Sequence, residues 1–305
     1  MQNSKGVDTG DQQTFMFCIG AQKAGTTWLQ SQLENQKDVF LARPKELHYW
    51  DCIRSPYFEQ FKLRARKRLH VPAEGDPLRY RMSKFWRPDL KKRIALADCY
   101  AAIYTSAPYD HTAYLSYAGV GRKGARLVGD VTPSYALLDR ETYAEMLTCA
   151  PDVRFVFIMR DPVARLWSGL KQQYRSQIKK GGLTEEALIR RFEAVCRTPL
   201  DKNFLRSDYQ RTILELEAVV PSTCIHYCFF ETLLDPLRGE SDRAQLAHFL
   251  GIPASYLDAR EKVHTTENTF QLPPKNQATA RKALDSIYAP LSERFGDQIP
   301  ETWYI

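Results

Sequence analysis

The residues with the clearest chemical potential form a short loop near the N-terminus that is bounded by two glycines. Gly20 and Gly25 are separated by four residues, Lys23 lies between them, and Thr26 and Thr27 follow. The backbone N–H groups of such a loop, together with the start of the next helix, bind phosphate groups. The spacing is close to that of a Walker A loop, but Thr26 stands where that loop has its lysine. We therefore expect a nucleotide-phosphate site that differs from that of an ordinary Mg-ATP enzyme.

A second candidate phosphate site begins at Arg160, which follows an apolar run. Asp161 can cap the next helix, Pro162 suits its first position, and Ser168 lies eight residues after Arg160. An arginine binds a phosphate with a fork of donors, and the helix start adds N–H groups and partial positive charge. This spacing predicts a strand, a turn and a helix that together hold an anion.

The elements that must position these residues are indicated by short apolar runs with helical patterns between some of them. This alternation is typical of parallel strands with crossover connections. The runs are residues 14–19, 126–128, 153–159 and 223–230. The sequence therefore predicts the α/β class: a single domain over residues 1–305, similar to P-loop NTPases, with a central parallel sheet flanked by helices.

Residues 54–126 interrupt this pattern, and we interpret them as a helical insertion or cap that shapes an acceptor site. The basic clusters in it fit a solvated helix face, and its tyrosines could either pack between helices or form the floor of a pocket. Surface helices are expected at residues 183–196 and 207–219, and a C-terminal helix at 275–295.

The composition only weakly limits the possible partners and the cellular location. The 43 basic residues exceed the 36 acidic ones by seven, which fits an anionic partner without identifying it. No stretch is long and apolar enough to span a membrane, and seven scattered cysteines favour reduced thiols. We expect a cytoplasmic protein, with no membrane span and no nucleic-acid partner.

The glycine loop resembles the 5′-phosphosulfate loop of sulfotransferases that use 3′-phosphoadenosine 5′-phosphosulfate (PAPS). Lys-x-Gly-Thr-Thr-x-Leu of that family matches residues 23–29, and its pair of Arg and Ser residues that holds the 3′-phosphate matches Arg160 and Ser168. The resemblance implies the following donor-binding residues: Gly20, Gln22, Lys23, Ala24, Gly25, Thr26, Thr27, Trp28, Arg160 and Ser168.

Two further segments particularly resemble the heparan-sulfate and bacterial branch of this family. Residues 43–50 are similar to its Pro-Lys-Glu-x-His-aromatic segment, which implies Glu46 as the base, with Lys45 stabilising the transferring group and His48 as the alternative base. Residues 129–135 are similar to Gly-Glu-x-Thr-Pro-x-Tyr, with Asp130 in place of Glu. The latter implies four residues at the substrate: Asp130, Thr132, Ser134 and Tyr135.

The function implied is in-line sulfuryl transfer from PAPS to a hydroxyl or amine of a carbohydrate or small molecule, which could be anionic. Lys23 would neutralise the leaving phosphate of the product, adenosine 3′,5′-bisphosphate (PAP), without a metal ion. Two alternatives stay open at this point: a P-loop kinase or NTPase that uses Mg-ATP with Asp130 on magnesium, and a non-catalytic protein that binds a nucleotide or polyanion. The sequence leaves the acceptor and the oligomeric state undetermined.

Overall fold

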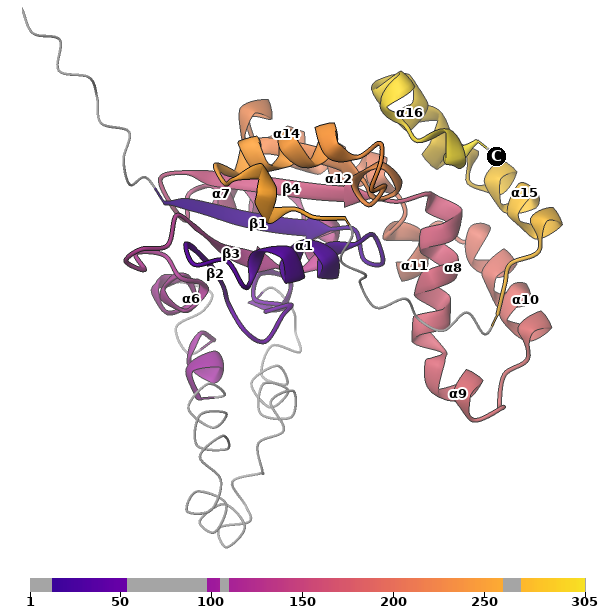
Figure 1. Ribbon diagram of the computed structural model, residues 1–305. Helices are drawn as coiled ribbons and strands as arrows, with labels where there is room; N and C mark the ends of the chain where they lie inside the picture. The colour runs from indigo at the N-terminus through magenta and orange to yellow at the C-terminus, as the bar shows by residue number, and fades with distance from the viewer. Residues whose placement is uncertain (1–12, 54–97, 105–109, 260–269, 305) are drawn as a thin grey trace, which may run out of the picture.

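The computed structural model describes residues 13–53, 98–104, 110–259 and 270–304. Their centre is a sheet of parallel strands in the order β2-β3-β1-β4-β5, which confirms the predicted α/β class (Figure 1). The strands are β1 (Thr14–Gly20), β2 (Val39–Leu41), β3 (Leu127–Val131), β4 (Val153–Met159) and β5 (Ile225–Phe229). The sequence did not reveal β2, because three residues are too few to show a pattern.

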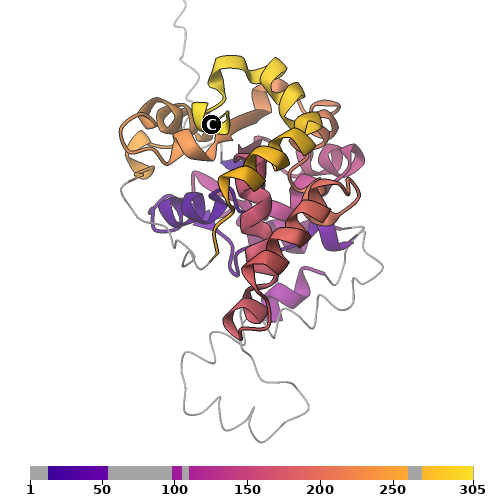
Figure 2. The same cartoon turned by 90° about the vertical axis from the view of Figure 1, so that its right-hand side faces the viewer.

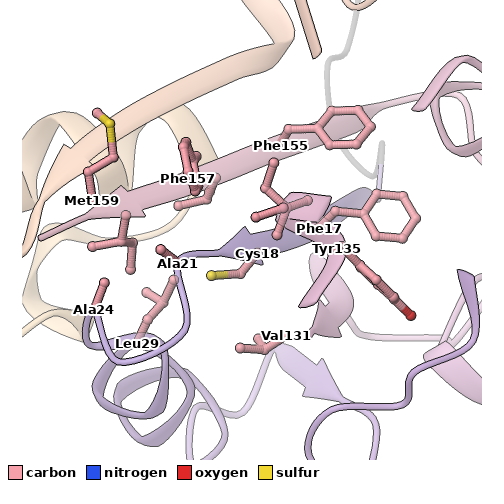
Figure 3. Packing of buried hydrophobic residues seen from close by; sticks show 14 of the residues in the cluster. Phe17, Cys18, Ala21, Ala24, Leu29, Val131, Tyr135, Phe155, Phe157 and Met159 are labelled. Carbon is pink, nitrogen blue, oxygen red and sulfur yellow. The ribbon is translucent and has the colours of Figure 1, made fainter. Parts of the chain in front are cut away.

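The central strand, β1, is buried along its whole length, as expected for a parallel strand covered on both faces. Phe17 lies opposite Asp130 on β3 and Phe155 on β4. The rings of Phe17 and Phe155 stack with centroids 5.4 Å apart, and Tyr135 meets Phe17 edge-on (Figure 3). This packing fixes the strand from which the glycine loop leaves the sheet.

Helices lie on both sides of the sheet, with α14 on one side and α1 on the other (Figure 1). Beyond the carboxyl ends of the strands, a second group containing α8, α10 and α15 forms a helical lobe, which faces the viewer in Figure 2. The helices are α1 (Thr26–Leu33), α2 (Trp50–Ile53), α6 (Thr112–Ala118), α7 (Arg140–Leu147), α8 (Pro162–Gln173), α9 (Arg175–Lys179), α10 (Glu185–Cys196), α11 (Lys202–Leu205), α12 (Tyr209–Glu217), α13 (Phe230–Leu233), α14 (Glu240–Leu250), α15 (Pro274–Ala283) and α16 (Asp285–Phe295).

The C-terminal region differs from the prediction of one helix over residues 275–295. It forms α15 and α16, which are separated at Leu284, where φ is −101° and ψ is 15°. The side chain of Leu284 is fully buried, whereas α15 buries only Ala280 of its own residues. The break lets α16 turn an apolar face to the core while α15 stays mostly exposed.

Part of the expected insertion at residues 54–126 lies outside the described residues, namely 54–97 and 105–109. In the part that is described, Tyr100, Tyr104 and Tyr114 are buried, and Tyr114 stacks on Tyr49 with ring centroids 4.1 Å apart. These tyrosines therefore pack in the core and do not line an open pocket. Among the described residues, no helix is both long enough and apolar enough to cross a membrane.

Candidate active site

The glycine loop lies between β1 and α1 and is held by close packing. A Cβ atom on Gly20 would lie 2.9 Å from the Cβ of Ala136, and one on Gly25 would lie 2.8 Å from the Phe230 ring. Gly25 also has φ of 87°, a left-handed conformation that glycine adopts at little cost. Helix α1 begins at Thr26 without a side-chain cap, so its first N–H groups can bind a ligand. The backbone is thus arranged to surround an anion.

Lys23, in the middle of this loop, is surrounded by other cations. Burial lowers the pKa of Lys23, and the positive charges of Arg160, Lys171, Arg175 and Lys45 lower it further. These neighbours come from the ends of β4 and α8, from α9 and from the segment after β2. Gathering like charges is unfavourable unless an anion binds among them. The arrangement therefore favours a ligand with more than one negative charge.

Arg160 is fixed against the loop. Its Nη1 donates to the carbonyl oxygen of Lys23 at 3.0 Å, and its guanidinium lies over the Phe230 ring, 4.7 Å from the centroid. The hydroxyl of Tyr209 donates to the Arg160 carbonyl oxygen at 2.8 Å. The buried Nε of Arg160 has no hydrogen-bond partner among the described residues, while Ser168 lies partly exposed on α8. An unpaired buried donor beside the loop indicates a place for a ligand oxygen.

The turn after Arg160 is tied to the C-terminal helices. Asp161 caps α8 by accepting from the Ala164 N–H at 2.7 Å, as predicted. The same carboxylate accepts from the Tyr288 hydroxyl at 2.8 Å and lies 3.6 Å from Arg281. Helices α15 and α16 therefore help to hold Arg160 beside the glycine loop.

A second group of polar residues, the 45–51 segment, lies next to the loop. Lys45 Nζ donates to Thr27 Oγ1 at 2.5 Å and lies 4.0 Å from Glu46 Oε1. His48 Nε2 lies 3.5 Å from Glu46 Oε2, and its Nδ1 lies 2.8 Å from Asp51 Oδ2. The structure thus brings the three predicted residues of this segment together and connects them to the glycine loop.

His48 carries a proton at neutral pH. Burial opposes the charged form, but hydrogen bonds with Asp51 and Glu46 outweigh it and raise the pKa of His48 to about 9. Ser134 reinforces this arrangement by donating to Asp51 Oδ2 at 2.7 Å. Asp51 was missed in the sequence, although its place three residues after His48 suits a contact across one turn.

Asp130 connects β3 to the 45–51 segment. It is 2% exposed and accepts hydrogen bonds from the hydroxyls of Thr132, Tyr135 and Tyr114 at 2.6, 2.7 and 2.9 Å. The Tyr135 hydroxyl in turn accepts from the Tyr49 N–H at 3.0 Å. Burial raises the pKa of Asp130, and the hydroxyls oppose that rise. These contacts hold the backbone of the 45–51 segment in place.

The four residues that the resemblance implies at the substrate differ in their exposure to solvent. Asp130, Thr132 and Tyr135 are buried, and only Ser134 is partly exposed. Burial favours a positioning role for the first three over the substrate contact that the sequence implied.

Three residues of the site have a left-handed backbone. Lys23, Glu46 and His48 have φ values of 72°, 62° and 56°, and among the described residues they are the non-glycine residues with positive φ. Such conformations cost about 1 to 3 kcal/mol each and persist where surrounding contacts impose them. All three are residues that the sequence singled out for chemistry.

Of the other predicted loop residues, some are buried beneath the loop and some lie at the protein surface. Ala24 and Trp28 are buried, and Trp28 Nε1 donates to the Asp258 carbonyl oxygen at 3.3 Å. Gln22 is half-buried and Thr27 is exposed. Within the described residues, no group of three or more His, Cys, Asp or Glu side chains could hold a metal ion.

Comparisons with known proteins agree with this architecture. The model of the sulfotransferase family matches residues 16–255. The fold is similar to a crystal structure of a sulfotransferase from Alicyclobacillus acidocaldarius, with a TM-score of 0.56, 18% identity, and coverage of 97% of this chain and 100% of that one. It is also similar to the sulfotransferase domain of the Synechococcus PCC 7002 olefin synthase, with a TM-score of 0.51, 18% identity, and coverage of 94% and 95%. No curated protein matches significantly.

Proposed function

The chain belongs to the sulfotransferase family, and on this premise we propose that it transfers a sulfuryl group from PAPS to a hydroxyl or amine of an acceptor. The observation that carries the proposal is the group of cations around Lys23 in the glycine loop. When bound, PAPS supplies the sulfuryl group and a phosphate leaving group. It is anionic at both its 5′ and its 3′ end, and the cations at the glycine loop and at Arg160 support its binding.

The glycine loop binds one end of the donor, and Arg160 together with Ser168 of α8 binds the other end. The loop amides, Thr26 and Thr27 hold the 5′-phosphosulfate, and Lys23 neutralises the charge that develops on the leaving oxygen. Arg160 and Ser168 hold the 3′-phosphate. The unpaired Nε of Arg160 supports this assignment, because a phosphate oxygen would satisfy it.

Glu46 is the proposed base. With a pKa of about 9, His48 already holds a proton at neutral pH and cannot accept another. His48 instead donates toward Glu46 and orients its carboxylate, with Asp51 fixing the imidazole from the other side. The proton of the acceptor therefore goes to Glu46, and Lys45 stabilises negative charge on the group in transfer.

The kinase alternative fits the structure less well. It would place magnesium on Asp130, but that carboxylate is buried and already accepts hydrogen bonds from three hydroxyls. Breaking these contacts to bind a cation would also release the 45–51 segment. The displaced lysine of the loop argues in the same direction.

Thermal unfolding with different nucleotides tests the proposal. We expect PAP in the presence of EDTA to raise the melting temperature, because a ligand at a hundred times its Kd stabilises the folded state by about 2.7 kcal/mol. Mg-ATP at the same concentration should stabilise the protein less. Stabilisation by Mg-ATP alone would favour the kinase and contradict the proposal.

A further inference from the structure

The face of α8 that carries Ser168 continues beyond the donor site. Lys171 follows Ser168 by three residues and Arg175 by seven, a spacing that places side chains on one face of a helix. At the junction of α8 and α9, the Ile178 N–H donates to the Tyr174 carbonyl oxygen at 2.9 Å, so the helical path is nearly continuous. Helix α9 lies at the end of α8 that points away from the sheet (Figure 1).

Positive charge on this face reaches the centre of the site. Lys171 and Arg175 are both close enough to Lys23 for their charges to lower its pKa. Burial lowers the pKa of Lys171, and the charge of the nearby Arg160 lowers it further. Cations therefore lie along this face from the glycine loop to the start of α9, and the carboxylate of Glu185 also lies near Lys171.

A surface groove of about 480 Å³ lies at the end of this path. Its lining contains three cations and no carboxylate: Gln172, Gln173, Arg175, Ser176, Lys179 and Lys180. In the part of the chain that the structure describes, no ion pair involves Arg175, Lys179 or Lys180. Helix α9 buries none of its residues, so these cations are available to a ligand.

We propose that this groove, residues 172–180, binds an anionic group of the acceptor, which therefore carries a carboxylate, sulfate ester or phosphate ester in addition to the accepting hydroxyl or amine. The inference rests on the proposed function and specifies its acceptor class. The anionic ends of PAPS are assigned to the loop and to Arg160, which leaves the groove for a different ligand. An acceptor anchored there extends past Arg175 toward Lys23.

Equilibrium binding of labelled maltotetraose tests the inference. The probe is prepared in neutral, sulfated, phosphorylated and carboxylated forms, and each is titrated into protein saturated with PAP at low ionic strength, so that the donor site is filled. The test variant is Lys179→Gln with Lys180→Gln, and the control is Lys37→Gln with Lys123→Gln. All four lysines are exposed, and both variants lose the same net charge.

We expect wild-type protein to bind at least one anionic form more tightly than the neutral form. The test variant should bind that form about fivefold more weakly, since two exposed charge contacts each contribute a few-fold. The control variant should bind it like wild type, and all proteins should bind PAP equally. The form that binds most tightly identifies the anionic group.

Equal binding of the neutral and anionic forms, or equal weakening in the test and control variants, would overturn the inference while leaving the proposed function intact. Failure of wild-type protein to bind PAP would instead contradict the proposed function and the inference with it.

Discussion

Replacing Tyr135 by phenylalanine removes one oxygen atom from the contacts that join Asp130 to the 45–51 segment. That hydroxyl donates to Asp130 Oδ2 at 2.7 Å and accepts from the Tyr49 N–H at 3.0 Å. The ring itself is fully buried and meets Phe17, so phenylalanine can keep its packing. The substitution therefore isolates the hydrogen bonds.

The expected loss of stability follows mainly from those two bonds, because a third, from the Trp50 N–H at 3.4 Å, is long and weak. A hydrogen bond to a charged group contributes about 1.5 to 3 kcal/mol, and a buried N–H left unpaired costs about 1 to 3 kcal/mol. Asp130 keeps its bonds from Thr132 and Tyr114, which limits the loss, so we expect about 2 to 4 kcal/mol. A displacement of Glu46 of about 1 Å would lower kcat by up to about a hundredfold.

Urea unfolding and sulfuryl transfer at saturating PAPS measure the two effects. Tyr227→Phe is the matched control, because its hydroxyl donates to Glu217 Oε1 at 2.9 Å from β5, an edge strand that pairs with β4. We expect the control to lose about 1.5 kcal/mol, the lower end of that range because the contact is only partly buried, and to keep its kcat. If Tyr135→Phe also lost only stability, the Asp130 contacts would not position Glu46, and that part of the reasoning would be wrong.

Four further predictions concern single residues of the site. Lys23→Ala should fold normally but lower kcat by about 10² to 10³, as removal of one charge-stabilising donor does; near-normal turnover would refute its role. Arg160→Ala should weaken PAP by about tenfold or more in calorimetry and leave adenosine 5′-monophosphate unaffected; an equal loss for both nucleotides would remove the 3′-phosphate assignment. Glu46→Gly should abolish transfer while its stability in urea stays within about 1 kcal/mol of wild type, because glycine adopts a φ of 62° freely and this offsets the lost contact with His48; retained activity would exclude Glu46 as the base. The pKa of His48 is raised from 6.5 to about 9, so protonated His48 stabilises the fold. This stabilisation is complete below pH 6.5 and is lost as the pH rises through 9. Wild-type protein should therefore lose on the order of 2 to 3 kcal/mol over this range relative to His48→Asn, and parallel pH curves of unfolding would contradict the assigned contacts.

The glycine loop and the strands of the α/β sheet could be predicted because their signals are local. Gly20, Lys23 and Gly25 lie within one loop, and the cap by Asp161 depends on residues of the same turn. Such features follow from backbone conformation and short-range hydrogen bonds, which sequence spacing specifies.

The rest depended on segments that only the fold brings together. Lys171 and Arg175 approach Lys23 from α8 and α9, and no spacing relates them to the loop. Asp130 was expected at the substrate because residues 129–135 resemble a segment of the sulfotransferase family. Its register on β3, opposite Phe17 in the buried centre of the sheet, makes it a buried residue. Burial is a property of the packed sheet, so the match of a short segment could not reveal it.

The central claim is that this chain uses Lys23 and Glu46 to move a sulfuryl group from PAPS to an acceptor. Mass spectrometry of wild-type protein, incubated with labelled PAPS, EDTA and a panel of hydroxyl and amine acceptors, tests it most directly. We predict that one or more acceptors gain a labelled sulfuryl group in equal amount to the PAP released. Lys23→Ala should form both products about 10² to 10³ times more slowly, and Glu46→Gly should form neither. Release of PAP without any sulfated acceptor, near-normal transfer by Lys23→Ala, or transfer that persists in Glu46→Gly would contradict the account.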